Sequence, residues 1–248
     1  MESSTFDTLV AEIRRRLDAV REEIAQAAER SGRPANAVRL IAVTKTHPAP
    51  VLQAAVAAGV TEIGENYLQE AGDKFTALGW PEAVTGGAPV TRHAIGHIQT
   101  NKIRLALDWF EMIQTVDSLR LAERIDRIAG EIGRSVPVLL QVNISEESTK
   151  SGFFYQEVEG ILPRLAKLAH IQVEGLMTIG RLEPDPEAAR GEFAAVRALS
   201  ERLGQVSPPE IRFRELSMGM SHDFAVAVEE GATMVRVGSR LFGPRQYT

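Results

Sequence analysis

The chain has no cysteine among its 248 residues, which excludes disulfide bonds and metal sites built on thiolates. Its five histidines supply no metal site either, because no group of His, Asp or Glu has the spacing of metal ligands. His93 and His97 lie close together in the sequence but in the wrong phase to share an ion. The lack of cysteine fits a reducing compartment.

Apolar runs of membrane-spanning length are also absent, and the N-terminus lacks the basic start and apolar core of a signal peptide. The net charge is −5 and the isoelectric point is about 5.7, so charge gives no reason to expect nucleic acid or an anionic membrane as a partner. The proportions of hydrophobic residues, 44%, and charged residues, 25%, are typical of a soluble globular protein. We therefore expect a cytoplasmic protein.

Residues 1–34 predict an N-terminal packing helix. Apolar residues recur there at helical spacing, while arginines and glutamates fill the other face; the apolar positions are Leu9, Ile13, Leu17, Val20 and Ile24. Gly32 followed by Pro34 predicts the end of the helix.

Strand-like and helix-like segments alternate after this helix. The predicted strands lie near 38–45, 60–64, 93–96, 110–115, 136–143, 171–177, 212–217 and 233–237. Such alternation is typical of parallel βα units, and eight of them favour an α/β fold with a closed (β/α)₈ barrel of the TIM type. The alternative is an open, doubly wound sheet, because the third strand is short and polar.

The segments between these elements are too short to be domain linkers, and no repeat or low-complexity tract interrupts the pattern. We therefore expect one domain over residues 1–248, in which the helix of residues 1–34 packs against a barrel of residues 38–245.

Lys45 is the most informative residue of the chain. It ends the apolar run 38–45, which reads as a parallel strand buried on both faces, directly before a break at Pro48. The carboxyl ends of such strands are where α/β folds build their sites. Loss of water favours a neutral, nucleophilic amine, the form that a Schiff base requires. A surface lysine that merely ends a strand is the alternative interpretation.

Two short turns are candidates for binding a phosphate. Ser217 and Gly219 follow the predicted seventh strand and lead toward a helix for which Ser221 is a candidate N-cap. Gly238 and Ser239 follow the predicted eighth strand. Barrels commonly bind phosphate after these two strands. An ordinary turn and helix cap is the alternative for the first segment.

Two further polar residues belong to the same predicted rim. Arg236 lies within an apolar strand and, if buried, needs either a structural carboxylate or another acceptor, such as a heteroaromatic nitrogen. Asn66 closes the second strand and lies at the same rim as Lys45, with a helix N-cap as the alternative role. No nucleophile elbow, Walker loop or dinucleotide fingerprint occurs in the chain.

The chain resembles the pyridoxal 5′-phosphate homeostasis protein family, single-domain barrels similar to the N-terminal domain of alanine racemase. The resemblance runs from about Val38 to Arg245. Short motifs in a specific order carry it: Ala42-Val43-Thr44-Lys45, Gly64-Glu65-Asn66, Ile95-Gly96-His97-Ile98-Gln99-Thr100-Asn101-Lys102, Gly175-Leu176-Met177-Thr178-Ile179, Ser217-Met218-Gly219-Met220-Ser221 and Val235-Arg236-Val237-Gly238-Ser239.

The resemblance implies a role for each candidate residue. Lys45 would hold the cofactor aldehyde as a Schiff base, Arg236 would face the pyridine nitrogen, and Asn66 and Met177 would line the ring. The phosphate would be held by Ser217, Gly238 and Ser239. The family is implied to bind pyridoxal phosphate and to buffer or deliver it, which affects vitamin B6 and the balance of amino acids and keto acids.

The chain departs from the family pattern at three positions. Arg92 and Ala94 stand where the family usually has Trp and Phe, so we expect the third strand to pack differently. Ser239 replaces a frequent Thr and keeps the hydroxyl.

Catalysis is less favoured than carriage. A racemase needs a second base opposite the lysine, and the resemblance implies that alanine racemase takes this base, a tyrosine, from a further domain for which a chain ending at Thr248 has no room. An arginine at the pyridine nitrogen also leaves that nitrogen unprotonated, which weakens the ring as an electron sink.

We therefore expect a monomeric carrier without catalytic residues, with pyridoxal-phosphate-dependent apoenzymes as its recipients. One alternative is a racemase-like enzyme of low efficiency. The other is a cofactor-free aldolase in which Lys45 attacks a sugar phosphate held by the same two turns.

Overall fold

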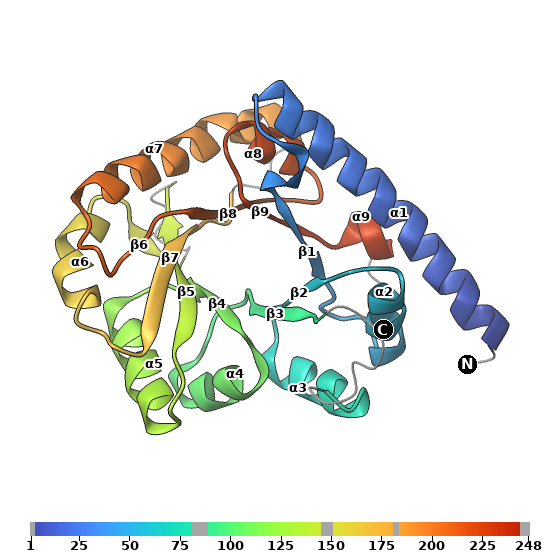
Figure 1. Cartoon of the computed structure of the whole chain (residues 1–248), viewed down its shortest axis with the longest axis horizontal. Helices are drawn as coiled ribbons and strands as arrows, with labels where there is room; N and C mark the ends of the chain where they lie inside the picture. Colours follow the sequence, from blue (N-terminus) through green and yellow to red (C-terminus); the bar gives the residue numbers. More distant parts are fainter. Residues whose placement is uncertain (1–2, 81–88, 145–150, 181–183, 244–248) are drawn as a thin grey trace.

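The computed structural model describes residues 3–80, 89–144, 151–180 and 184–243. In these residues eight parallel strands form a closed ring (Figure 1), and each strand pairs with the next. The strands of the ring are β1 Arg39–Val43, β2 Glu62–Glu65, β3 Thr91–Ala94, β4 Met112–Val116, β5 Val136–Asn143, β7 Ile171–Met177, β8 Glu215–Met220 and β9 Met234–Val237. A two-residue strand, β6 Phe153–Phe154, pairs with the end of β5.

This closure confirms the TIM-type barrel. The β4–β5 and β1–β9 pairings leave no open edge in the ring, so the open doubly wound sheet is wrong. The strands lie near their predicted positions, and only β6 had no counterpart in the expected pattern.

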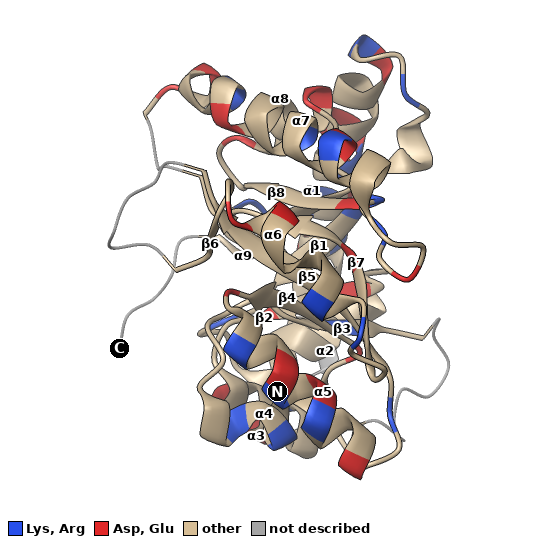
Figure 2. Ribbon diagram, turned by 90° about the vertical axis from the view of Figure 1, so that its left-hand side faces the viewer, with Lys and Arg blue, Asp and Glu red and all other residues tan. Residues whose placement is uncertain are grey.

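Helices surround the ring of strands (Figure 1). They are α2 Ala49–Ala57, α3 Leu68–Ala77, α4 Ile103–Trp109, α5 Leu119–Glu131, α6 Val158–Leu165, α7 Arg190–Val206, α8 Phe224–Glu229 and α9 Ser239–Phe242, with short 3₁₀ helices η1 Ala35–Ala37, η2 Thr100–Lys102 and η3 Pro186–Ala189. The helices carry charges of both signs, whereas the strands are mostly uncharged (Figure 2). Within the described residues, no helix combines the length and the apolar character needed to cross a bilayer.

The N-terminal helix α1, Ser3–Arg30, packs across the outside of the barrel against α2, α8 and α9 (Figure 1). Its predicted apolar face is buried at Ile13, Leu17, Val20 and Ile24. The helix ends as expected, with Gly32 in the left-handed region at φ 70°, a conformation that glycine adopts without strain.

Strand alternation creates two apolar regions. The larger one fills the space between the barrel and the helices, and a small separate cluster lies among the strands: Ile41, Met112, Leu139, Met177 and Met234. Buried polar side chains, His93, Gln114, Ser217 and Arg236, also come from strands of the ring.

The third strand, β3, departs from the family pattern at Arg92 and Ala94, and both residues are accommodated by neighbouring side chains. Arg92 points outward, is 8% exposed, and forms an ion pair with Glu111. Its guanidinium carbon lies 5.5 Å from the ring centroid of Phe75 and 5.9 Å from that of Trp80, within the range of a cation–π contact. The arginine therefore packs on aromatic rings, while the small Ala94 is fully buried.

The expected end of the seventh strand of the ring is wrong. A strand over 212–217 followed by a turn was predicted, but β8 runs from Glu215 to Met220. Gly219 has φ 88°, and the pairing with β9 shifts by one residue between Ser217 and Met220, so the glycine forms a bulge within the strand and does not make a turn. Ser221 is consequently not the N-cap of α8, a position that Asp223 occupies.

Candidate functional site

A cavity of about 300 Å³ opens at the carboxyl ends of the strands, at the lower end of the range usual for small-molecule sites. It is lined by Val43, Lys45, Asn66, Ile95, Met177, Ile179, Met220, Ser221, His222, Asp223, Arg236, Gly238 and Ser239. We call it the rim cavity. The structure thus brings together every predicted site residue except Ser217, although these residues follow or belong to strands far apart in the sequence.

Lys45 lies two residues beyond β1, half-buried at the wall of the rim cavity. The next residue, Thr46, has φ 66° and is the one non-glycine residue with positive φ in the described parts of the chain. Such a backbone costs about 1–3 kcal/mol and persists only where neighbours hold it. Here the N–H of Thr46 donates to Oε1 of Glu70 over 2.6 Å.

A buried ammonium group beneath Lys45 fixes both of its neighbours in the chain. Nζ of Lys74 donates to the carbonyl of Thr44 at 2.8 Å and lies 2.6 Å from Oε1 of Glu65 and 2.8 Å from Oε1 of Glu70. Helix α3 thus holds Thr44 directly and Thr46 through Glu70. The backbone that carries Lys45 is fixed on both sides. We call Lys74, Glu65 and Glu70 the lysine clamp.

Glu65 is the most buried member of this clamp. Its side chain is 0% exposed, and burial raises the pKa of its carboxyl, with the charge of Lys74 acting in the opposite direction. Oε1 of Glu65 also accepts from the hydroxyl of Thr44 over 2.6 Å, whereas Oε2 is buried without a partner in the described structure. In the sequence Glu65 stands out only as part of the motif Gly64-Glu65-Asn66, and nothing local singles out Lys74.

Arg236 forms the deep cationic wall of the rim cavity. It is 4% exposed, and its guanidinium donates to the hydroxyl of Ser217 and to the carbonyl of Thr178, each over 2.7 Å. Burial lowers the pKa of Arg236 to about 10, with the negative charge of Asp223 opposing the shift, so the group stays protonated at neutral pH. None of the described carboxylates forms an ion pair with it, although Asp223 lines the same cavity, so its charge is only partly offset and can still attract an anion.

The two serines of the 217–221 segment have different positions. Ser217 is 0% exposed, lies outside the cavity lining, and donates its hydroxyl to Oε1 of Gln114 over 2.7 Å. Ser221 lines the cavity instead, and its hydroxyl accepts the backbone N–H of Gly238 over 3.0 Å. The bulge at Gly219 explains this, because it extends β8 and turns Ser217 into the barrel.

Asn66 carries an unused hydrogen-bonding atom. Its Oδ1 is buried and has no partner in the described structure, which is costly unless a ligand or water satisfies it. Its backbone is held by close packing, since a Cβ on Gly96 would lie 2.1 Å from the carbonyl oxygen of Asn66. Only glycine fits at position 96.

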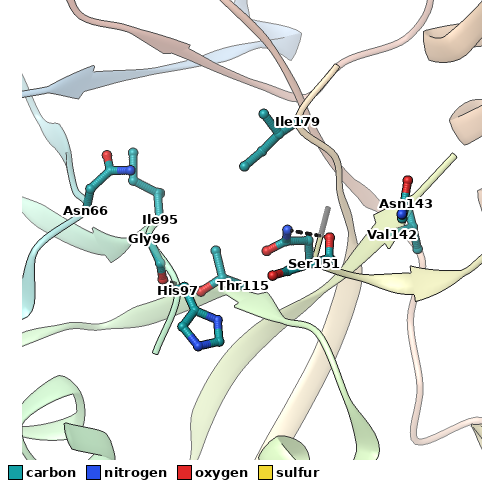
Figure 3. Close-up of a pocket in the computed structure, with 10 residues that line it drawn as sticks. Asn66, Ile95, Gly96, His97, Thr115, Val142, Asn143, Ser151 and Ile179 are labelled. Atoms are coloured by element: carbon teal, nitrogen blue, oxygen red, sulfur yellow. Dashed lines mark hydrogen bonds between the residues drawn. The ribbon is translucent and has the colours of Figure 1, made fainter. Parts of the chain in front are cut away.

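A second cavity of about 230 Å³ adjoins the first and shares Asn66, Ile95 and Ile179 with it. Figure 3 shows Asn66, Ile95, Gly96 and His97 on one side and Val142 and Asn143 on the other, with Thr115 and Ser151 between them. The lining residues not shared with the rim cavity are Gly96, His97, Thr115, Gln141, Val142, Asn143 and Ser151. The amide of Gln141 donates to the carbonyl of Ser151 over 2.9 Å (Figure 3). The site is therefore wider than the rim cavity alone.

Comparison with known proteins places this geometry in a family. Residues 16–246 match the family model for the alanine racemase N-terminal domain. The chain is 37% identical over 241 residues to the pyridoxal phosphate homeostasis protein of Escherichia coli K12, covering 96% of this chain and 98% of that protein. The corresponding protein of Pasteurella multocida is 34% identical over 236 residues, covering 95% and 99%.

The chain belongs to the pyridoxal phosphate homeostasis protein family. Among solved structures, PipY of Synechococcus elongatus PCC7942 with pyridoxal phosphate bound is 41% identical, has a TM-score of 0.80, and matches over 93% of this chain and 100% of that chain. An alanine racemase of Clostridium difficile is 18% identical with a TM-score of 0.71, which shows a shared barrel fold. The family resemblance inferred from the motifs is confirmed.

The residues that line the rim cavity suit pyridoxal phosphate, the cofactor in the name of the family. Lys45 offers an amine, Arg236 a buried positive charge without an ion pair in the described chain, and Asn66 a buried oxygen without a partner. An aldehyde on an anionic, polar heteroaromatic ring is complementary to such a set. Neither tyrosine of the described chain, Tyr67 or Tyr155, lines the rim cavity.

Proposed function

We propose that this protein binds pyridoxal 5′-phosphate in the rim cavity and buffers or delivers it, thereby maintaining intracellular vitamin B6 and the balance of amino acids and keto acids. One observation carries the proposal: an amine, Lys45, and a buried arginine without an ion pair in the described structure, Arg236, line the same cavity. The family name of the relatives and the pyridoxal phosphate bound to PipY support it.

In this proposal each residue has a distinct task. Pyridoxal phosphate, when bound, supplies an aldehyde and an electron-withdrawing ring. Lys45 holds the aldehyde covalently, and the lysine clamp fixes the backbone on either side of it. Gly238, Ser239 and Ser221 hold the phosphate, and Ser221 takes this role in place of Ser217, which lies outside the cavity lining.

Asn66 and Met177 line the ring in this proposal, and Arg236 donates to its nitrogen. Guanidinium has donors and no acceptor and keeps its proton, so it leaves the ring nitrogen unprotonated. Arg236 would thus keep the ring a weak electron sink, which suits a protein that holds the cofactor without consuming it. Ser217, which lies outside the cavity lining, accepts a hydrogen bond from Arg236 and helps to hold it in place.

We also propose the wider setting. The chain acts as a monomer in the cytoplasm, residues 38–245 form one binding domain with the helix of residues 1–34 packed on it, and pyridoxal-phosphate-dependent apoenzymes receive the cofactor. The mouth formed by the two adjoining cavities is where such a recipient would gain access.

Visible absorbance of the purified protein tests the proposal. We expect an absorbance band of the bound cofactor that borohydride and Lys45→Ala each abolish, and that Lys102→Ala leaves unchanged. A colourless protein that takes up no pyridoxal phosphate would favour the cofactor-free aldolase. Rapid loss of deuterium from α-deuterated alanine in the wild-type protein would favour the racemase-like enzyme.

A further inference from the structure

A chain of hydrogen bonds crosses the inside of the barrel from Arg236 to Glu62. Arg236 is 2.7 Å from the hydroxyl of Ser217, and that hydroxyl is 2.7 Å from Oε1 of Gln114. Nε2 of Gln114 is 3.1 Å from Nδ1 of His93, and Nε2 of His93 is 2.9 Å from Oε2 of Glu62. Each link therefore has hydrogen-bonding distance.

The chain joins the two ends of the barrel. Glu62 is the first residue of β2, at the end opposite the rim cavity, whereas Arg236 lines that cavity. The three groups between them come from β3, β4 and β8, and each is 0% exposed. They are closed to bulk solvent, so every polar atom in the chain depends on its neighbours.

The direction of every hydrogen bond follows from Arg236. Guanidinium only donates, so the hydroxyl of Ser217 accepts from it and donates its own hydrogen to Oε1 of Gln114. The amide nitrogen of Gln114 then donates to Nδ1 of His93. Nδ1 is therefore without a hydrogen, and Nε2 carries one and donates it to the carboxylate of Glu62.

Inside the barrel this arrangement gives Arg236 neutral hydrogen-bond partners, while Asp223, the carboxylate whose charge acts on it, lines the rim cavity and forms no ion pair with it in the described structure. Three neutral groups solvate the buried guanidinium with aligned dipoles, and the hydrogen-bond chain reaches a carboxylate, Glu62, only at the far end of the barrel. Glu62 is also held by Arg39, at 3.6 Å. A carboxylate placed next to Arg236 would hold the arginine equally well, but it would cancel the charge that faces the cavity.

We propose that Gln114 and His93 are positioning residues that hold Arg236 through Ser217 and keep its positive charge available to an anionic ligand in the rim cavity. The inference deepens the proposed function, because pyridoxal phosphate is the anion concerned. The hydrogen-bond direction can be measured without any ligand, so the two proposals can fail separately.

The first test is the tautomer of His93 in the ligand-free protein, by nitrogen-15 NMR of labelled histidine. We expect a hydrogen on Nε2 and none on Nδ1 in the wild type. In Gln114→Glu, a carboxylate replaces the amide donor, and His93 is expected to gain a hydrogen on Nδ1 as well. A wild-type His93 protonated on Nδ1 would reverse the chain and overturn the proposal.

The second test is binding. Gln114→Glu places a carboxylate one hydroxyl away from Arg236, so the dissociation constant for pyridoxal phosphate should rise about ten- to hundredfold, the loss expected for a bond to a charged group. Gln172→Glu adds the same charge at an exposed position of β7 and should bind as the wild type does. Wild-type affinity in Gln114→Glu would overturn the proposal.

Two substitutions of His93 provide a second test that holds even if Gln114→Glu does not fold. His93→Gln keeps an acceptor for Gln114 and a donor for Glu62, and should retain wild-type affinity. His93→Leu removes both and should bind more weakly than His93→Gln at equal thermal stability of the two folded proteins. Equal affinity of His93→Leu and the wild type would show that the chain serves only the fold, which would contradict a positioning role.

Discussion

Gly238 donates its backbone N–H to the hydroxyl of Ser221 over 3.0 Å, and this bond joins the segment after β8 to the segment after β9 at the edge of the rim cavity. The hydroxyl accepts that bond and still has its own hydrogen to donate. The two segments are therefore fixed relative to each other, with Ser221 turned toward the cavity.

Ser221→Ala should weaken the retention of pyridoxal phosphate. The change removes one hydrogen bond to a charged phosphate, worth about 1.5–3 kcal/mol, or about ten- to hundredfold in affinity. Ser239→Ala should have a similar effect, measured by fluorescence titration of the apoprotein. Ser207→Ala, at the end of α7, is the control. Unchanged affinity in the Ser221→Ala Ser239→Ala double variant would place the phosphate elsewhere.

Lys74→Met should destabilise the protein by about 3–5 kcal/mol, because it leaves the carboxylate of Glu65 buried without its partner. Adding Glu65→Gln should restore much of that loss, since no unpaired charge then remains. Urea unfolding of both variants measures the effect, with the exposed Lys167→Met as a control that stays within about 0.5 kcal/mol of wild type. A small loss in Lys74→Met would mean that the clamp is weak.

The raised pKa of Glu65 predicts a pH dependence of stability. A carboxyl whose pKa is higher in the folded state contributes stability below its unfolded pKa of about 4.3, and this contribution is lost as pH rises through the folded value. The free energy of unfolding of the wild type, relative to Glu65→Gln, should therefore fall as pH rises above that point. Urea unfolding at several pH values measures it, and a constant difference would contradict the assigned burial effect.

Arg236→Glu should bind pyridoxal phosphate more weakly than wild type, because it buries a carboxylate and repels the phosphate. The fraction that binds should exchange amino-acid α-protons faster, since a protonated carboxyl can supply a proton to the ring nitrogen. Titration of the cofactor with deuterium loss from α-deuterated alanine tests both effects. Wild-type affinity with unchanged exchange would make Arg236 a purely structural arginine.

The sequence predicted the barrel because its evidence is local: apolar strands alternate with amphipathic helices, and Lys45, Asn66 and Arg236 each stand at or near a strand end. The position of Ser217 outside the cavity lining could not be predicted, because a glycine after a strand reads equally well as a turn or as a bulge. The choice between them depends on pairing with β9, which lies far away in the sequence until the barrel closes.

The residues that hold Lys45 and Arg236 in place could not be predicted from the sequence, for a related reason. Lys74 stands on a helix in a pattern that suits a solvated ion pair with Glu70, and nothing local shows that Thr44 and Glu65 bury it. His93 and Gln114 are polar residues in short strands, and their linkage exists only across the inside of the ring. Strand periodicity could at most have placed both on the inner face.

Covalent binding of the cofactor by Lys45 is the central claim of the proposed function. The most direct measurement is mass spectrometry of tryptic peptides after the purified protein, loaded with pyridoxal phosphate, has been reduced with borohydride. The chain offers Lys74, Lys102, Lys150 and Lys167 as internal alternatives. We expect the pyridoxyl group on Lys45. A modification on any other lysine, with Lys45 unmodified, would contradict the account.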